Sequence, residues 1–125
     1  RRQRQMCIRD RLSVLGNLVD NALDAAAAPD LSAADRWVDV EVVSDATGLV
    51  VQVADGGPGP SDADRRRLFD RGWSTKPVGA AGRGMGLWLT RRIAEEAGGV
   101  ADVATDSGTV FTVEVPREPT PQEAT

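Results

Sequence analysis

Apolar residues recur every three or four positions between residues 12 and 28, which is the spacing of one face of an amphipathic helix. Pro29 follows directly, and proline ends a helix because it lacks a backbone N–H and its ring clashes with the preceding turn. The pattern predicts a helix over residues 12–28. Its apolar positions are Leu12, Leu15, Val19, Ala22, Leu23 and Ala26.

Two apolar runs with the alternation of strands come next. In residues 37–43 (WVDVEVV) valines at alternate positions fall on one face, and residues 49–54 (LVVQVA) form a second run. The intervening residues 45–48 end in a glycine, as a tight turn often does. We predict a β-hairpin here.

The middle of the chain is less regular. Ser61 is suited to cap a short helix that contains Leu68 and Phe69. Residues 71–83 hold too many glycines and too little periodicity for regular structure, so we expect a mobile loop.

The last third repeats the pattern of the first. Residues 84–97 have helical spacing, and the glycine pair at 98–99 supplies a C-terminal stop. Residues 100–105 and 109–115 alternate again as a second hairpin. The order of elements predicts an α/β fold, a two-layer sandwich in which helices cover one face of a mixed, largely antiparallel sheet.

The 125 residues suffice for one domain, which we place at residues 12–116. Residues 1–11 hold five arginines without hydrophobic periodicity, so we expect a head that is either non-native or a linker. Residues 117–125 are polar with two prolines, and we expect them to form a disordered tail. No apolar run approaches the roughly 20 residues that a membrane-spanning helix requires.

Composition removes several kinds of chemistry. The chain has one cysteine and no histidine, which excludes an internal disulfide, a Cys/His zinc site and a histidine-activated nucleophile. The net charge of −4 disfavours sequence-independent binding to nucleic acid, because that binding depends on clustered Lys and Arg. A polyanionic ligand would therefore need a dedicated local site.

Asn17, Asn21 and Asp24 project from one face of the first predicted helix, because they stand at i, i+4 and i+7. A solvated helix face is one explanation for three such polar residues. A metal site is the other, since a carboxamide oxygen such as that of Asn21 suits Mg²⁺, which proteins hold through few groups plus substrate phosphates.

Residues 55–59 (DGGPG) follow directly on a predicted strand. Glycine with proline is enough for an ordinary tight turn. Asp55 is also well placed to accept a hydrogen bond from the exocyclic amine of a ring, because glycine lets a ring lie close to the backbone. The pattern leaves both interpretations open.

Residues 82–87 (GRGMGL) lead from the predicted loop into a helix. Glycines leave backbone N–H groups free to approach an anion, and a helix N-terminus favours phosphate. The segment is not a dinucleotide fingerprint, because it follows a long loop, and it lacks the Gly-Lys-Ser/Thr end of a P-loop. Lys76 and Arg83 are either solvated loop charges or groups that neutralise phosphate.

Taken in order, five segments resemble the N, G1, F, G2 and G3 boxes of the GHKL ATPase superfamily. They are residues 17–25 (NLVDNALDA), 55–59 (DGGPG), 69–76 (FDRGWSTK), 82–87 (GRGMGL) and 107–111 (SGTVF). The resemblance spans residues 12–116 and is closest to the catalytic ATP-binding domain of sensor histidine kinases of the citrate and C4-dicarboxylate type. It implies the histidine-kinase ATPase fold without its first strand, which would leave a sheet edge exposed.

The resemblance implies ATP and Mg²⁺ as ligands. Asn21 would bind the magnesium, Asn17 would face the phosphates, and Asp55 would accept from the adenine amino group. Thr109 would support the adenine end through Asp55 or a water, and residues 71–83 would close as a lid. The remaining implied ATP-binding residues are Gly57, Gly59, Lys76, Gly82, Arg83, Gly84, Met85, Gly86 and Leu87. The implied catalytic residues are Asn17, Asn21, Lys76 and Arg83.

The implied activity is that of a protein-histidine kinase in two-component signal transduction. The γ-phosphoryl group would pass to a histidine on an upstream dimerisation domain, since the chain has none, and then to the receiver domain of a response regulator. The resemblance implies a homodimeric parent protein, with this domain on the cytoplasmic side of a membrane-anchored sensor. Asn17 stands where hydrolytic relatives carry a glutamate base, which favours transfer to a protein over hydrolysis.

Gly56 and Pro60 depart from the family pattern, which usually has asparagine and a small aliphatic residue there; we expect both to be tolerated. Two other functions remain open at this point. One is an anti-sigma-factor serine kinase of the same superfamily, which acts on a small partner protein without a histidine domain. The other is a non-catalytic nucleotide-binding module.

Overall fold

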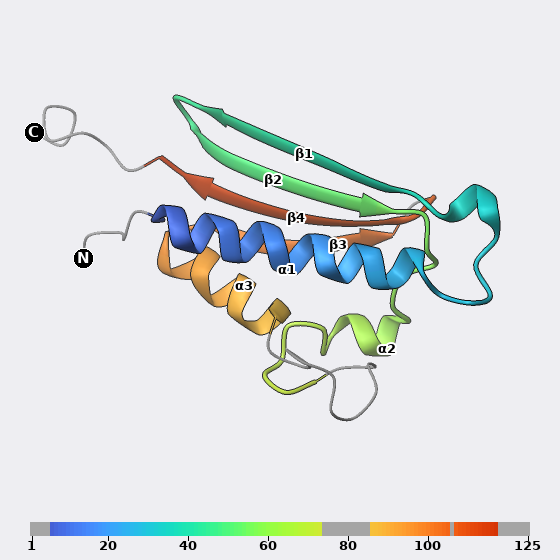
Figure 1. The fold of residues 1–125 in the computed structure, drawn as a ribbon. Coiled ribbons are helices and arrows are strands. Elements are labelled where there is room, and N and C mark those ends of the chain that lie inside the picture. Colours follow the sequence, from blue (N-terminus) through green and yellow to red (C-terminus); the bar gives the residue numbers. More distant parts are fainter. Residues whose placement is uncertain (1–5, 74–85, 106, 118–125) are drawn as a thin grey trace, which may run out of the picture.

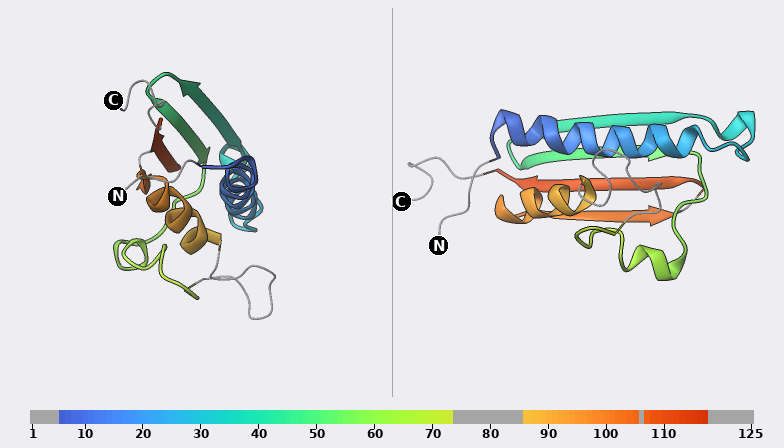
Figure 2. Two further views of the ribbon diagram at one scale, coloured as in Figure 1. Left: turned by 90° about the vertical axis from the view of Figure 1, so that its left-hand side faces the viewer. Right: turned by 60° about the horizontal axis from the view of Figure 1, so that its bottom comes forward.

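The computed structural model describes residues 6–73, 86–105 and 107–117. Within them, a four-stranded sheet in the order β1-β2-β4-β3 carries helices α1 and α3 on one face (Figure 1 and Figure 2). Every pairing in this sheet is antiparallel. The predicted two-layer sandwich is confirmed.

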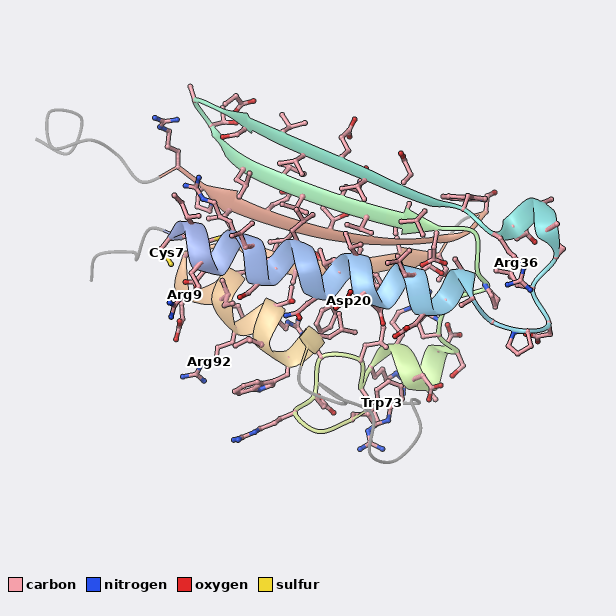
Figure 3. All side chains as sticks on the ribbon, in the orientation of Figure 1. Cys7, Arg9, Asp20, Arg36, Trp73 and Arg92 are labelled. Atoms are coloured by element: carbon pink, nitrogen blue, oxygen red, sulfur yellow. The ribbon has the colours of Figure 1, made fainter. Side chains whose placement is uncertain are left out.

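Helix α1 (Ile8–Ala26) begins earlier than residue 12, so the predicted start is wrong. Cys7, labelled at the start of the helix in Figure 3, is the cap: its Sγ accepts a hydrogen bond from the Asp10 N–H at 3.4 Å. Met6, just before it, is buried in the core. These contacts bring the second half of the predicted head into the fold.

Arg36 completes the other end of α1. Its guanidinium, labelled in Figure 3, donates to the carbonyl of Ala26 at 2.8 Å and to that of Pro29 at 3.4 Å. The last carbonyls of a helix have no hydrogen-bond donors within the helix, and Arg36 supplies donors here. A single 3-10 turn, η1 (Ala33–Asp35), precedes Arg36 and leads the chain into the sheet.

Both predicted hairpins are confirmed. β1 (Val38–Asp45) pairs with β2 (Gly48–Asp55), and β3 (Val100–Thr105) pairs with β4 (Thr109–Pro116). The two hairpins join where β2 pairs with β4, and in this register the last residue of β2, Asp55, lies opposite the first residue of β4, Thr109. The join therefore brings two candidate site residues together at one end of the sheet.

β1 is an edge strand, and no described residue pairs with its outer side. Val40 and Val42 share a face with the buried residues opposite them on β2, yet their side chains are 44% and 51% exposed. β1 therefore presents an exposed edge that carries partly exposed valines.

Helix α2 (Asp62–Arg65) has the predicted cap, because the Ser61 hydroxyl accepts from the Asp64 N–H at 3.1 Å. The prediction that this helix contains Leu68 and Phe69 is wrong. The chain leaves the helix after Arg65 and continues through turns, which allow Phe69 to pack edge-on against Phe111 of β4 with ring centroids 6.3 Å apart.

Helix α3 (Gly86–Glu96) ends as the sequence predicts. Gly98 adopts a φ of +81°, which favours glycine, and the Gly99 N–H donates to the Ala94 carbonyl at 2.8 Å. This is the Schellman arrangement, completed by the Gly98 N–H to the Glu95 carbonyl at 3.0 Å. Residues 84 and 85, predicted as the start of this helix, lie outside the described residues.

The core lies between the helices and the sheet. Its most buried members include Val14, Leu18 and Ala22 of α1, Ile93, Ala94 and Ala97 of α3, and Val51, Val53, Phe111 and Val113 of the sheet. None of the described helices is long and apolar enough to span a bilayer. The packing fixes α1 and α3 side by side on one face of the sheet, and the C-terminal end of α1 reaches the end where β2 stops and β4 starts (Figure 1).

Gly16 lies on the exposed face of α1, with open space where a side chain would stand. Glycine costs about 0.5–1 kcal/mol in a helix interior relative to alanine, because its backbone loses more freedom on folding. We expect Gly16→Ala to raise the free energy of unfolding by that amount in urea titrations. A destabilised variant would contradict the description of this helix face.

Candidate functional site

Three residues on one face of α1 connect the two ends of the candidate site. Asn17, Asn21 and Ala25 are one turn apart from each other, and both asparagines are half-buried. Asn17 contacts the first residue of α3, and Ala25 contacts the turn after β2, where a Cβ at Gly57 would be 3.7 Å from the Ala25 Cβ. Eight residues of helix span about 12 Å. The strip is thus long enough to lie beside an extended small molecule.

At one end of the strip, the Asn17 side chain is tied to α3. Its Nδ2 donates to the Gly86 carbonyl at 3.2 Å and to the Thr90 hydroxyl oxygen at 3.4 Å. A carbonyl oxygen only accepts hydrogen bonds, so the amide nitrogen must face Gly86. The Asn17 oxygen, Oδ1, is the atom left for a ligand.

Asn21 stands in the middle of the strip. Its carboxamide makes no side-chain hydrogen bond within the part of the chain that the structure describes. In that part there is also no group of three or more His, Cys, Asp or Glu side chains that would form a metal cage of its own. The residues present fit Mg²⁺, which is commonly held by one or two protein oxygens together with phosphates and waters.

At the other end of the strip, Asp55 is a buried carboxylate, 2% exposed. Its Oδ1 accepts the Gly57 N–H at 2.8 Å. Burial raises the pKa of Asp55 above its ordinary value, and the Gly57 hydrogen bond opposes the rise. Its second oxygen, Oδ2, has no partner among the described residues and can accept a hydrogen bond from a ligand.

The glycines around Asp55 are required by close contacts. A Cβ at Gly57 would lie 2.9 Å from the Asp55 Oδ1, and a Cβ at Gly59 would lie 2.6 Å from the Thr109 Oγ1. Thr109 is 3% exposed, and its hydroxyl donates to the Gly57 carbonyl at 3.2 Å. Thr109 therefore supports Asp55 by fixing the turn whose N–H the carboxylate accepts.

The structure also explains why Gly56 departs from the family pattern. A Cβ at this position would lie 2.3 Å from the Asp35 carbonyl oxygen and 2.6 Å from the Trp37 Nε1. The segment before β1 thus packs directly on the turn after β2. An asparagine at position 56 would require this segment to move.

Two residues that hold neighbouring elements of this region together, Thr90 and Arg65, were not predicted from the sequence. Thr90 is a polar residue on the buried face of α3, a pattern that was visible in the sequence as one hydroxyl among apolar neighbours. Arg65 donates from its guanidinium to the Thr105 hydroxyl oxygen, which holds α2 against β3. No pattern in the sequence indicated that contact.

The remaining predicted residues lie at or beyond the start of α3. Gly86 and Leu87 are the first described residues of α3, and the Gly86 carbonyl is held by Asn17 of α1. Lys76, Gly82, Arg83, Gly84 and Met85 lie outside the described residues.

The profile of the family described as "Histidine kinase-, DNA gyrase B-, and HSP90-like ATPase" matches residues 9–119. The chain belongs to this ATPase family. The match covers every described helix and strand except the first residue of α1, and it confirms the GHKL resemblance seen in the sequence.

Similar proteins of this ATPase family are sensor kinases. The chain is 34% identical over 107 residues to the sensor histidine kinase CitA of Klebsiella pneumoniae, covering 84% of this chain and 19% of that protein. It is 38% identical over 112 residues to the C4-dicarboxylate transport sensor protein DctS of Rhodobacter capsulatus, covering 88% and 16%. The chain thus spans about a fifth of the length of these relatives.

A solved structure supports the same assignment. The catalytic domain of the histidine kinase ThkA superposes with a TM-score of 0.67 at 27% identity, covering 89% of this chain and 69% of that one. The two-layer arrangement of helices on a sheet is therefore that of histidine-kinase members of the ATPase family.

Proposed function

We propose that the chain is the ATP-binding catalytic domain of a two-component sensor histidine kinase. The observation that carries the proposal is the strip along α1. Its Asn17 end lies against the start of α3, and its Ala25 end lies next to the turn that holds the buried Asp55 carboxylate. A helix N-terminus suits phosphate, and a carboxylate oxygen without a partner suits an amine. These are the two ends of ATP.

In this arrangement the adenine amino group donates to the Oδ2 of Asp55, and the ring lies against the glycine turn. Gly57 and Gly59 have no side chains to keep it away, and Thr109 holds the turn in place. The phosphates lie at the start of α3, near the N–H groups of Gly86 and Leu87. Lys76 and Arg83 are proposed to neutralise phosphate charge.

Asn21 would hold Mg²⁺ through its carboxamide oxygen, together with the phosphates of ATP. When bound, the ion would neutralise phosphate charge and orient the γ-phosphoryl group. Asn21 is suited to hold it because its carboxamide is not engaged by another described residue. Asn17 and Asn21 are the catalytic residues proposed on α1.

The reaction is transfer of the γ-phosphoryl group to a histidine on the dimerisation domain of the parent protein. An imidazole nitrogen forms the P–N bond while the P–O bond to ADP breaks, ADP leaves, and the imidazole N–H proton passes to water. The carboxamide of Asn17 is no base at neutral pH, so the strip does not provide the group that activates water in hydrolysis. The described side chains bind and position ATP.

The sensor-kinase names of the similar proteins support the proposed partners. These are a histidine-bearing dimerisation domain, through which the parent would form a homodimer, and the receiver domain of a response regulator. The domain would lie on the cytoplasmic side of a membrane-anchored sensor. Radiolabel moving from γ-labelled ATP to an added dimerisation domain would support the transfer, and an unlabelled domain beside bound ATP would contradict it.

Asn21→Ala tests the metal assignment. We expect the affinity of the wild-type chain for ATP to rise when Mg²⁺ is added, and the affinity of the variant to be nearly the same with and without Mg²⁺. Calorimetric titration in buffer with Mg²⁺ and in buffer with a chelator measures both. Adenosine is the control ligand, because it has no phosphates, and its affinity should not change. A full Mg²⁺ effect in the variant would remove Asn21 from the site.

A further inference from the structure

The contact between α1 and α3 contains a buried hydroxyl to which neither the sequence nor the family assigns a role. Three polar or charged residues of the described chain are buried: Asp55, Thr109 and Thr90. The first two form the adenine end of the candidate site. Thr90 is 0% exposed and lies at the opposite end, on α3, where its Oγ1 accepts a hydrogen bond from Asn17.

A carboxamide such as that of Asn17 can present either of two different groups. Turning it over exchanges an oxygen, which accepts, for an NH₂ group, which donates. In this structure the Gly86 carbonyl and the Thr90 hydroxyl oxygen both accept hydrogen bonds from the Nδ2 group. With the two amide protons used in this way, the side chain offers a ligand only Oδ1.

This orientation decides what Asn17 can bind. Phosphate oxygens only accept hydrogen bonds at neutral pH, so Oδ1 cannot form one with them. An oxygen acceptor suits a water molecule, above all one made a better donor by a bound metal ion, or the metal ion itself. Asn17 is therefore directed toward the hydrated metal rather than toward phosphate.

We propose that Thr90 is a positioning residue for Mg²⁺-dependent ATP binding, acting through Asn17. The Gly86 carbonyl, which only accepts, sets which way the carboxamide of Asn17 is turned, and the Thr90 hydroxyl holds the carboxamide in that orientation, with Oδ1 left to serve Mg²⁺ or its waters. The proposal rests on the proposed function and deepens it. It also links the two helices: the same carboxamide holds the first residue of α3, whose N-terminus would receive the phosphates.

A purely structural explanation of Thr90 makes a different prediction. If Thr90 only fills space between α1 and α3, then valine, which has nearly the same shape, should serve equally well. Thr90→Val removes the hydroxyl and leaves the packing, and Thr90→Ser keeps the hydroxyl and removes a methyl group. The pair separates the hydrogen bond from the shape.

The experiment is calorimetric titration of the full chain with ATP in the presence of Mg²⁺, and with adenosine as control. For Thr90→Val we expect about three- to tenfold weaker binding of ATP with Mg²⁺, the usual effect of losing one hydrogen bond, and unchanged binding of adenosine. Thr90→Ser is expected to bind ATP close to the wild-type affinity.

A double-mutant cycle with Asn17→Ala shows whether Thr90 acts through Asn17. Once Asn17 is truncated, Thr90→Val should cause no further loss of ATP affinity. If Thr90→Val binds ATP as the wild type does, or weakens it equally with and without Asn17, the positioning role is wrong. A wild-type chain that binds neither ligand would instead contradict the proposed function itself.

Discussion

Asp55→Asn is expected to lower ATP affinity at least about 100-fold, because it replaces a charged acceptor with a donor at the adenine amine. The Gly57 N–H requires an acceptor, and the asparagine oxygen would take the place of Oδ1 in that hydrogen bond. The asparagine NH₂ group would then stand where Oδ2 is now. Two donors would face each other across the site, and neither would have a partner.

A ligand with the opposite polarity provides the control. ITP carries a carbonyl where ATP carries the amino group, so the wild-type carboxylate should disfavour it and the asparagine variant should bind it better than ATP. Calorimetry with both nucleotides on both proteins gives the four affinities. An unchanged preference for ATP in Asp55→Asn would show that the adenine does not meet Asp55.

The fold should survive this substitution. Burial raises the pKa of Asp55, so the charged form is disfavoured in the folded chain. For this group alone, stability is lower above the raised folded pKa and recovers as pH falls toward 3.8, its value in the unfolded chain. The asparagine removes that penalty, so we expect an equal or higher Tm at neutral pH. ATP affinity of the wild type should in turn decline as pH falls through the raised pKa of Asp55, because the carboxylate is then protonated.

Gly108→Ala is expected to damage the fold and the site together. Gly108 adopts a φ of +134°, and a Cβ there would lie 2.5 Å from the Asp55 carbonyl oxygen. Backbone strain of this kind costs of order 1–3 kcal/mol, before the clash with Asp55 is counted. We expect the free energy of unfolding to fall by about 3 kcal/mol and the Tm by roughly 10 °C, as measured by thermal unfolding.

Gly72→Ala is the matched control. Gly72 also has a positive φ, +82°, but nothing stands within 4 Å of the place where its Cβ would be. The difference between the two variants reports the contact with Asp55 together with the greater strain of a φ of +134°. ATP affinity should fall in Gly108→Ala because the strand end that carries Asp55 is displaced. Equal losses of stability in both variants would contradict this account.

Local signals in the sequence were sufficient for most of the fold. The glycine pair at 98–99 marked the end of α3 because only a positive φ completes that type of stop. The alternation of apolar residues predicted both hairpins, and Ser61 indicated the cap of α2. Asp55 and Thr109 could be named as candidates, and the register then placed them opposite each other.

Sequence patterns did not predict the features that depend on contacts between residues far apart in the chain. Cys7 caps α1 although cysteine is an uncommon cap, and the burial of Met6 depends on how the sheet ends beneath it. Phe69 leaves the helical pattern to meet Phe111, which is far along the chain. The orientation of Asn17 depends on Gly86 and Thr90 of another helix. No local pattern contains such information.

The packing of Trp37 has a practical consequence. Its indole lies against both Gly56 and Gly108, the glycines in the turns that flank Asp55. The emission of an indole depends on the polarity around it, so its fluorescence reports on the environment of these turns. With Trp73 and Trp88 replaced by phenylalanine, the remaining signal would come from this position alone, and the arrival of a nucleotide could be timed in a stopped-flow instrument without any added dye.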